Sequence, residues 1–341
     1  MTARTALRTP TSALLITRLA MEYGVSEQDC LRRTGLRGDD LRGGTLVTGV
    51  QEIALISNVL RALPDIAGLG LLAGLRYHAT AHGIWGYALI ASQSLRDAIE
   101  VGLRYLELSY SFCLITAVES ADEVSLVIVP EVTNPAVARF VAERDIGIIA
   151  TLYRDIAGPT ARLHTVRLPY PEPDPDTARR IAETLSCTVQ YDCDHYAAVF
   201  DRSTVDDPLP QADPHTAELA AGQCRDLAAA RRALTGTSGR VRDVVFAQPR
   251  GPLTEAEAAA ALHLSTRTLR RRLAAEGHSF RSLLDEVRSV LACELLSGTD
   301  LPTAAIADRL GYSESASFTR AFRRWTGTSP LRWRKAQPSP A

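Results

Sequence analysis

The stretch TEAEAAAALHLSTRTLRRRLAAEG, residues 254–277, has the pattern of two helices joined by a short turn. Thr254 followed three residues later by Glu257 is a capping-box start, and the alanine-rich run behind it forms a helix whose small side chains permit close packing. Ser265 suits the N-cap of a second helix, which leaves a turn of about three or four residues. The pattern therefore predicts a helix-turn-helix.

Arginines occupy the outward face of the second helix in this unit. On a 3.6-residue wheel, Leu269 and Leu273 face inward. Arg267 and Arg271 then point to the opposite side, and Arg270 lies on the flank. Since a guanidinium group can make paired hydrogen bonds to guanine in the major groove, we expect Arg267 and Arg271 to read bases.

A second unit of the same order follows at residues 301–327, LPTAAIADRLGYSESASFTRAFRRWTG. Pro302 suits the first turn of a helix, Gly311 suits the left-handed backbone of a tight turn, and Ser313 is a candidate cap for the next helix. That last helix carries an apolar stripe of Phe318, Phe322 and Trp325. Its opposite face carries Ala316, Arg320 and Arg324, with Ser317 to one side.

Arginines on one amphipathic helix have an alternative reading, because charged residues often only solvate the outer face of a helix. The chain, however, repeats the same order twice: a short helix, a short turn and a basic helix. The amphipathic stretch 280–295 separates the two units and predicts a helix from about Ser279 to Ser297. This repetition favours a DNA-binding domain.

The segments LSTRTLRRRLAAEGHSF (264–280) and IADRLGYSESASFTRAFRRWTGTSPLRWR (306–334) resemble the DNA-binding domain of the AraC/XylS family of bacterial transcription regulators. The match covers about a hundred residues and includes the closing signature of the family from Gly311 to Pro330. The resemblance implies two groups of base-contacting positions. They are Arg267, Arg270 and Arg271 in the first unit, and Ser315, Ala316, Ser317 and Arg320 in the second, to which the helical wheel adds Arg324.

Two positions depart from the family pattern. His263 stands where the family often has a turn glycine, and histidine tolerates left-handed geometry better than a β-branched residue does, so we expect the turn to be kept. Ala316 is too short to hydrogen-bond a base and can only touch a thymine methyl group.

The charge distribution agrees with this division of the chain. Residues 250–341 carry 14 Lys and Arg against 9 Asp and Glu, whereas the whole chain has 38 against 39 and a net charge of −1. The basic charge is therefore concentrated in the part predicted to bind DNA.

The preceding residues predict an α+β domain over residues 11–210, followed by a linker over 211–238 and an all-α DNA-binding domain with two helix-turn-helix motifs over 239–335. Residues 11–110 have mainly helical patterns, including 50–63 and 95–108. The β-rich stretches 111–118 and 123–132 predict a hairpin, residues 135–156 a helix on one face of the sheet, and three further strands follow.

Three stretches of the first domain resemble the helical, arabinose-binding-like sensory domain of one branch of AraC-type regulators. They are YGVSEQDCLRRTGL (23–36), HGIWGYALIASQSLRDAIEVGLRYLEL (82–108) and FDRSTVDDPLPQADP (200–214). The domain does not resemble the jelly-roll sensor of the sugar regulator that named the family, because it opens with helices. Sugar binding is therefore not implied.

A small-molecule effector is the expected ligand of this domain, and no cofactor is expected. The densest cluster of aromatic and titratable residues suggests His82, Trp85, Tyr105 and Tyr110 as ligand-binding candidates, against the alternative that these side chains fill the core. Metal sensing is a second alternative. It would use His78 with His82, which share a face if that segment is a helix, or Cys187 with Cys193 and His195, although their spacing fits no common zinc module.

An enzyme with a DNA-binding tail is the competing class of function. The sequence has no GxSxG elbow, no phosphate-binding glycine loop after a strand and no HExxH, so we expect no catalytic activity. The six scattered cysteines predict reduced thiols, and no stretch has the length of a bilayer span. We expect a cytoplasmic regulator whose partners are promoter DNA, RNA polymerase, a small-molecule effector and a second copy of the chain, without a membrane partner.

Overall fold

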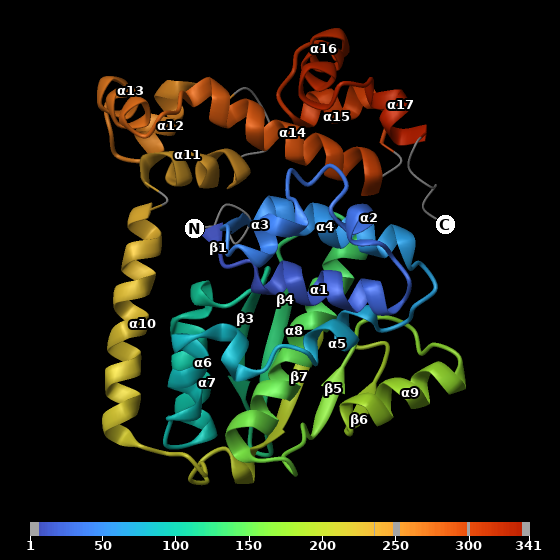
Figure 1. Cartoon of the computed structure of the whole chain (residues 1–341), viewed down its shortest axis with the longest axis vertical. Helices are drawn as coiled ribbons and strands as arrows, with labels where there is room; N and C mark the ends of the chain where they lie inside the picture. The colour runs from blue at the N-terminus through green and yellow to red at the C-terminus, as the bar shows by residue number, and fades with distance from the viewer. Residues whose placement is uncertain (1–6, 235, 248–252, 299–300, 336–341) are drawn as a thin grey trace.

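Two separate hydrophobic cores divide the chain (Figure 1). The computed structural model describes residues 7–234, 236–247, 253–298 and 301–335. Buried residues of the first core lie between Ala13 and Ala228, and those of the second lie between Val241 and Phe322. The first core belongs to an α+β domain and the second to a helical domain, as the sequence predicts.

Helices dominate the first hundred residues. They are α1 (Thr11–Glu22), α2 (Glu27–Cys30), α3 (Gly38–Arg42), α4 (Gly49–Ala62), α5 (Leu69–Gly74), α6 (Ile84–Ile90) and α7 (Leu95–Arg104), with the 3-10 turns η1 (Ala79–His82) and η2 (Leu106–Leu108). A capping box between Thr48 and Gln51 starts α4, the helix predicted over 50–63. Two short strands, β1 (Leu7–Arg8) and β2 (Val47–Thr48), pair antiparallel and escaped prediction, because two residues are too few to show a period.

A five-stranded sheet forms the second layer, with strand order β3-β4-β7-β5-β6. The strands are β3 (Cys113–Glu119), β4 (Glu123–Pro130), β5 (Thr165–Arg167), β6 (Thr188–Gln190) and β7 (Tyr196–Asp201), with the 3-10 turn η3 (Arg202–Thr204) after β7. The predicted hairpin is confirmed, since β3 and β4 pair antiparallel. The β5 and β6 strands are parallel, and the crossover between them contains α9 (Pro175–Leu185), a helix the sequence reading did not include.

The helix α8 (Pro135–Ala157) packs on one face of this sheet, as predicted for residues 135–156. It also contacts α5 along a seam of glycines. A Cβ atom on Gly74 would lie 2.1 Å from the backbone oxygen of Arg144, and one on Gly147 would lie 2.6 Å from that of Leu71. Only glycine permits this approach, which brings the middle of α8 close to the N-terminal helices.

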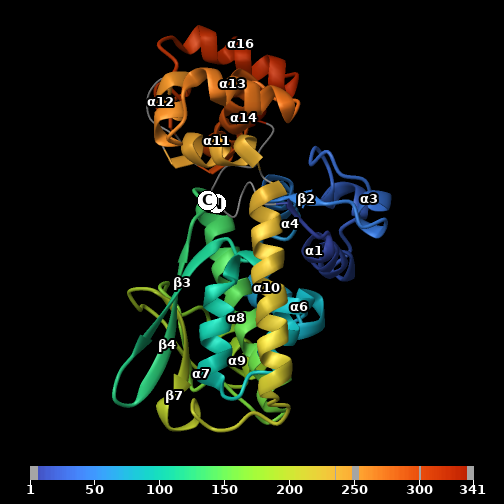
Figure 2. The same cartoon turned by 90° about the vertical axis from the view of Figure 1, so that its left-hand side faces the viewer.

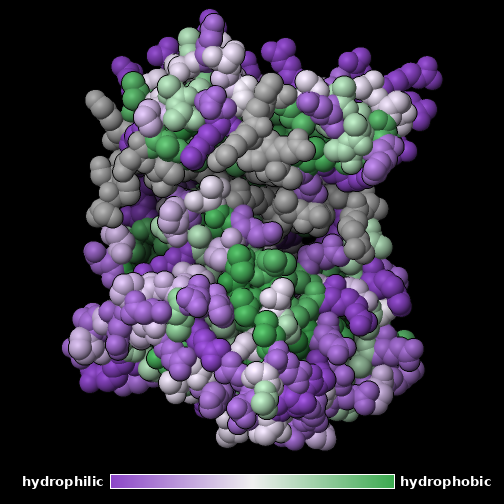
Figure 3. All heavy atoms as spheres, turned by 180° about the vertical axis from the view of Figure 1, so that it is seen from behind, coloured by the Kyte–Doolittle hydropathy of each residue, from purple (hydrophilic) through white to green (hydrophobic). Residues whose placement is uncertain are grey.

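The opposite face of the sheet is open at β3 and β4. Leu114 and Val118 on β3 and Val129 on β4 expose about half of their surface, at 54%, 54% and 48%. Figure 3 views the molecule from this side and shows apolar atoms gathered over the sheet. Strand β3 is also the edge strand of the sheet, so this apolar face continues to an unpaired strand edge.

The segment predicted as a linker is mostly helical. Within 211–238, α10 (Pro214–Leu234) runs along the first domain toward the DNA-binding domain (Figure 2). Ala220, Cys224 and Ala228 are buried in the first core, and the Arg231 guanidinium donates to the backbone oxygens of Glu107 and Leu108 at 3.3 and 3.4 Å. The connection between the domains therefore belongs physically to the first domain over much of its length.

Among the described residues from 236 onward, every element is a helix. They are α11 (Gly236–Ala247), α12 (Glu255–Ala261), α13 (Thr266–Ala275), α14 (Phe280–Gly298), α15 (Thr303–Arg309), α16 (Ser315–Thr326) and α17 (Pro330–Lys335). The start of α11 is held by Glu276, whose carboxylate accepts from the N–H groups of Thr237 and Ser238 at 2.7 and 2.8 Å. Taken over the described part of the chain, none of the helices combines the length and the apolar character that a membrane crossing needs.

Candidate nucleic-acid interface and sensor cavity

The first helix-turn-helix has the predicted caps. Thr254 and Glu257 form a reciprocal capping box at the start of α12, and Ser265 accepts from the N–H of Thr268 at the start of α13. The turn between them includes His263, which has a left-handed φ of 55°. Histidine therefore takes the turn position of the family glycine, as expected.

Three arginines of α13 differ in what they contact. Leu269 and Leu273 are fully buried, and Arg267 and Arg271 are exposed on the other side, where neither has a hydrogen bond or ion pair with another described residue. Arg270 is also exposed, but its guanidinium binds the carboxylate of Glu255 on α12 at 2.7–2.9 Å. The structure thus leaves the two predicted base readers free and ties the third to a neighbouring helix.

The second unit corrects two predictions about its helix starts. Pro302 occupies the N-cap position, one residue before α15 begins, and Gly311 has the expected left-handed φ of 75°. The predicted cap at Ser313 is wrong, because α16 begins at Ser315 and its N-cap residue is Glu314, without a side-chain cap hydrogen bond. The turn is one residue longer than the Ser313 cap would make it.

The second recognition helix, α16, buries Phe318 and Phe322. Its other face exposes Ser315, Ala316, Arg320 and Arg324, with Ser317 half-buried. The Arg320 guanidinium donates to the Ser317 hydroxyl at 3.1 Å. Arg324 binds Asp285 of α14 at 2.7 Å, so, like Arg270, this predicted contact residue already holds a carboxylate from a neighbouring helix.

The two recognition helices lie toward opposite ends of α14 (Figure 1). This helix has 19 residues, which corresponds to about 28 Å at 1.5 Å per residue. It packs against α11, α15, α16 and α17, and α11 in turn contacts α12 and α13 of the first unit. Buried residues of both units therefore belong to one core. Successive major grooves on one face of DNA are about 34 Å apart, and the arrangement matches that scale.

A cavity of about 90 Å³ lies in the first domain between α6, α7, α8 and the sheet. Its wall is mostly apolar, and His82, Ser109, Ser111 and Asp145 form a polar edge. His82 and Trp85, two of the predicted ligand residues, line it. Tyr105 and Tyr110 are buried outside its wall, where the Tyr110 hydroxyl donates to the backbone oxygen of Ala81.

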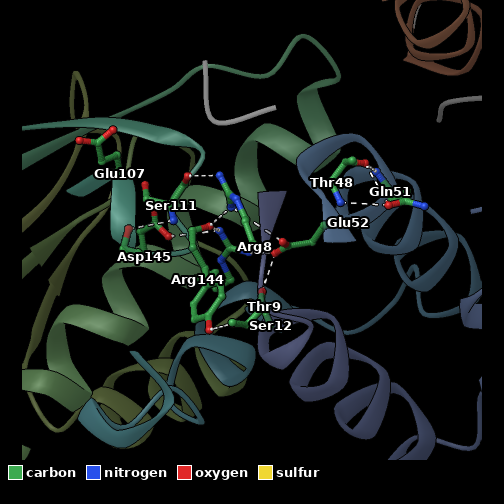
Figure 4. Close-up of polar contacts among 12 residues, drawn as sticks. Arg8, Thr9, Ser12, Thr48, Gln51, Glu52, Glu107, Ser111, Arg144 and Asp145 are labelled. Carbon is green, nitrogen blue, oxygen red and sulfur yellow. Dashed lines mark hydrogen bonds and ion pairs between the residues drawn. The ribbon is translucent and has the colours of Figure 1, made fainter. Parts of the chain in front are cut away.

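A buried cluster of charges lies behind the polar edge (Figure 4). Arg144 is completely buried, and its guanidinium binds Glu52 at 2.9 Å and the backbone oxygen of Tyr110 at 2.5 Å. Arg8 donates to the same oxygen at 2.9 Å. Asp145 accepts from the Ser111 hydroxyl at 2.5 Å through Oδ2, whereas its Oδ1 lies 3.5 Å from Arg144 and has no hydrogen bond with a described residue.

His82 is the other cavity residue with unsatisfied polar atoms. Neither ring nitrogen has a hydrogen-bond partner among the described residues, and the ring lies between Trp85 and Tyr110, at 5.0 and 5.3 Å from their centroids. Burial, reinforced by the Arg144 charge, lowers the pKa of His82 to about 3, so the imidazole is neutral at physiological pH. Burial raises the pKa of Asp145.

The residues of the metal alternative do not come together. The predicted helical face with His78 and His82 is wrong, because His78 precedes the 3-10 turn η1 and binds Asp155 through Nδ1 at 3.1 Å, while His82 faces the cavity. The Cys193 thiol donates to the backbone oxygens of Gln190 and Tyr191. Within the described ranges, no group of three His, Cys, Asp or Glu side chains is placed to hold a metal ion, Cys187 and His195 included.

The buried charges escaped prediction, although the sequence carries a signal for them. Glu52 lies on the apolar stripe of α4 with Leu55 and Ile56, and Arg144 lies on that of α8 with Phe140 and Ile148. A charge at an inward position of an amphipathic helix indicates a buried ion pair. The partners Glu255 and Asp285 carry no comparable signal, because they lie 15 and 39 residues away from Arg270 and Arg324.

Comparisons with known proteins agree with both halves of the structure. The model of the arabinose-binding domain of AraC transcription regulators matches residues 24–209, and a helix-turn-helix model matches residues 258–336. The chain belongs to the AraC family of transcription regulators. An uncharacterised HTH-type transcriptional regulator of Mycobacterium tuberculosis is 36% identical over 92% of both chains, and the ornithine utilization regulator of Pseudomonas aeruginosa is 33% identical over 93% of both.

A solved structure shows the same fold. The transcriptional regulator CdpR from Pseudomonas aeruginosa covers 95% of this chain and 98% of its own, with a TM-score of 0.50 and 23% identity. The family models and the sequence relatives show that the chain is a DNA-binding transcription regulator, with an α+β N-terminal domain and a helical DNA-binding domain. Its relatives by sequence are regulators as well.

Proposed function

We propose that one chain reads a promoter with both of its recognition helices at once. In this proposal α13 enters one major groove and α16 enters the next, and α14 sets the distance between them. The observation that supports it most strongly is the placement of two recognition helices with exposed arginines toward opposite ends of one 19-residue helix. A shared core resists independent movement of the two units.

The proposed base contacts follow from exposure and from competing partners. Arg267 and Arg271 are exposed and hold no described carboxylate, so they are the primary readers in α13. Arg320, with Ser317 bound to it, is the primary reader in α16, and Ser315 is the first residue of that helix. Arg270 and Arg324 must each leave an intramolecular carboxylate before they can contact DNA. Their contribution to DNA-binding affinity is therefore smaller.

The N-terminal domain, proposed to span residues 11–210, binds a small-molecule effector, and residues 211–238 connect it to the promoter reader at 239–335. The cavity beside His82 supports a sensing role. We propose that the signal comes from binding rather than from turnover, that the regulated machinery is RNA polymerase, and that the protein acts in the cytoplasm, where its promoter DNA lies.

We also propose that the first domain pairs with a second copy of the chain through β3 and β4. The apolar face at Leu114, Val118 and Val129 ends at the edge strand β3, a combination that suits pairing between identical sheets. Sedimentation velocity tests this. A concentration-dependent dimer that Val118→Lys abolishes agrees with the proposal, and a monomer at every concentration contradicts it.

Promoter reading is tested by competition binding over randomised DNA sites with the full chain. Arg271→Ala and Arg320→Ala should each cost about 1–3 kcal/mol and relax preference at a limited set of positions. Arg225→Ala is the matched control, because Arg225 is an exposed arginine on α10, outside both units. If Arg271→Ala lowers affinity for all sites equally and leaves the preference unchanged, Arg271 is not a base reader.

A further inference from the structure

The cavity between α6, α7, α8 and the sheet has one chemical asymmetry. Most of its wall comes from aliphatic side chains, including Leu89, Ile99 and Leu103, while a single edge carries His82 and Asp145. Both polar residues are almost completely buried, with 6% and 2% of their surface exposed. His82 Nδ1, His82 Nε2 and Asp145 Oδ1 nevertheless lack hydrogen bonds with other described residues.

Unsatisfied polar atoms at this depth are costly and are rarely left without a partner. For His82 the neighbouring groups supply none, and for Asp145 Oδ1 they supply only the Arg144 guanidinium, 3.5 Å away. Asp145 Oδ2 already accepts from Ser111, and the shorter contacts of the Arg144 guanidinium are with Glu52 and the backbone oxygen of Tyr110. The remaining direction for Asp145 Oδ1 and His82 is the cavity that both residues line.

We propose that this cavity is the effector site and that its ligand is a small neutral aliphatic alcohol, with the hydroxyl group at the His82–Asp145 edge and the hydrocarbon part among the aliphatic side chains. The proposal rests on the sensing role given above and adds to it the site and the chemical class of the ligand. The hydroxyl hydrogen is donated to Asp145 Oδ1, and the hydroxyl oxygen accepts from the neutral imidazole of His82.

The charge of the surroundings selects a neutral head group. Two guanidinium groups, Arg8 and Arg144, face two carboxyl groups, Glu52 and Asp145, behind the polar edge. An ammonium group on the ligand would lie near the two arginines, and a carboxylate would lie near the two acids. A hydroxyl group adds no charge and satisfies both a donor and an acceptor.

The volume limits the hydrocarbon part. A cavity of roughly 150 Å³ in another protein holds one benzene ring. The cavity of this chain, at about 90 Å³, is smaller and therefore suits a ligand with a short hydrocarbon chain. 1-Butanol is a suitable probe, and methyl propyl ether is its isomer without a hydrogen-bond donor.

The site also has a direct connection to the DNA-binding domain. Leu106 of η2 lines the cavity, and Arg231 of α10 holds the backbone oxygens of the next two residues, Glu107 and Leu108. Helix α10 ends at Leu234, and α11 of the DNA-binding domain begins at Gly236. A ligand that displaces Leu106 therefore acts on the element that leads into the promoter reader.

The experiment titrates the full chain with 1-butanol, methyl propyl ether, n-butylammonium and butyrate, followed by protein NMR. We expect 1-butanol to bind at least about tenfold more tightly than each of the other three, since only the alcohol offers a neutral donor. Ala98→Leu fills the cavity from α7 and should abolish binding, whereas Ala229→Leu, the same change on the exposed face of α10, should not. Leu103→Phe replaces Ala98→Leu if that variant does not fold.

The same samples are tested for DNA binding, so that a failure of the proposed ligand site can be distinguished from a failure of promoter reading. If the chain selects a promoter sequence but binds the alcohol no better than the ether, or if Ala98→Leu and Leu103→Phe leave alcohol binding unchanged, the site assignment is wrong while promoter reading stands. If the chain binds 1-butanol at this site but selects no DNA sequence, the proposed promoter reading fails. Asp145→Leu should remove the preference for the alcohol over the ether, because leucine has no acceptor for the hydroxyl hydrogen.

Discussion

At the scale of single residues, the Arg270–Glu255 ion pair limits the contribution of α13 to DNA-binding affinity. The guanidinium of Arg270 binds Glu255 at 2.7–2.9 Å on a solvent-exposed surface. An exposed pair contributes little to stability, but its carboxylate repels a nearby phosphate backbone and competes for the arginine. We therefore predict that Glu255→Gln tightens binding to promoter DNA by about two- to fivefold and leaves the unfolding midpoint nearly unchanged.

Fluorescence anisotropy at fixed ionic strength measures this effect. The control is Glu183→Gln, which removes an exposed carboxylate of the first domain, with 69% of its side chain exposed. Equal affinities of Glu255→Gln and the parent chain would show that Arg270 stays away from DNA.

His82 provides a residue-scale prediction about pH. Burial lowers its pKa to about 3, below the value of about 6.5 expected in the unfolded chain. Since the folded state resists protonation, its full stability is present above about pH 6.5 and decreases as the pH falls toward 3. Between pH 7 and pH 5 the contribution of His82 should fall by about 1–2 kcal/mol, and His82→Phe should lack that loss.

Urea unfolding at pH 7, 6 and 5 checks this prediction through the difference between the two proteins. Subtracting the variant from the parent removes the contribution of the carboxylates common to both. His215→Gln is the control, because His215 is exposed on α10. Parallel pH profiles for the parent and His82→Phe would mean that the imidazole is solvated in the folded protein.

At the scale of elements, the seam between α5 and α8 holds the buried charges in register. A Cβ atom on Gly147 would meet the backbone oxygen of Leu71 at 2.6 Å and the Cα of Gly74 at 2.9 Å. Backbone cannot yield as a side chain does, so Gly147→Ala should force α8 away from α5 and destabilise the first domain by about 1–3 kcal/mol. Calorimetry of the full chain measures the loss.

Gly222→Ala is the matched control for this seam. Gly222 lies within α10, where the nearest atom to a new Cβ is the flexible end of Arg225 at 3.5 Å. Alanine there should raise stability by about 0.5–1 kcal/mol, because glycine is a poor helix former. A destabilisation shared by both variants would point to a general effect of the methyl group and not to the seam.

The elements also show which parts of the fold the periodicity of the sequence predicts. The hairpin β3–β4, the helices α4 and α8 and the long helix α14 have strong period-two or period-3.6 patterns, and all were predicted. The helix α9 was missed because proline-rich residues surround it, although Asp174 and Pro175 form a regular helix start. The predicted cap at Ser313 was wrong because Glu314, which is not a typical cap residue, occupies the N-cap position of α16.

The residues of the candidate sites also fall into those that the sequence predicts and those that it does not. A helical wheel finds exposed arginines on α13 and α16, since the period of one helix decides which residues face outward. It cannot find Glu255 or Asp285, which reach those arginines from other helices. Aromatic clustering led to His82 and Trp85 but also to Tyr105 and Tyr110, because composition alone does not distinguish the wall of a cavity from the packing behind it.

At the scale of the whole molecule, α14 determines how the two helix-turn-helix units, here called heads, fit one DNA site. The second unit packs directly on this helix of about 28 Å, and the first unit packs on α11, which itself contacts α14. Both units share one hydrophobic core, so their spacing is fixed by folded structure and not by a tether. The heads also differ, with Arg267 and Arg271 in one and Ser317 with Arg320 in the other. We predict two unlike half-sites about 10 base pairs apart, arranged directionally, with more guanines under α13.

Insertions between the half-sites test this rigid reader. Five added base pairs place the second half-site on the opposite face of the duplex, and ten return it to the same face about 34 Å farther away. A fixed α14 can reach neither position, so both insertions should reduce specific affinity to that of a single half-site. Two flexibly tethered heads would instead lose little with either insertion, and a dimer that uses one head per chain would recover with ten base pairs. Mobility-shift titrations of the parent site and the two insertions, with equal competitor DNA, therefore distinguish a single two-headed chain from both alternatives.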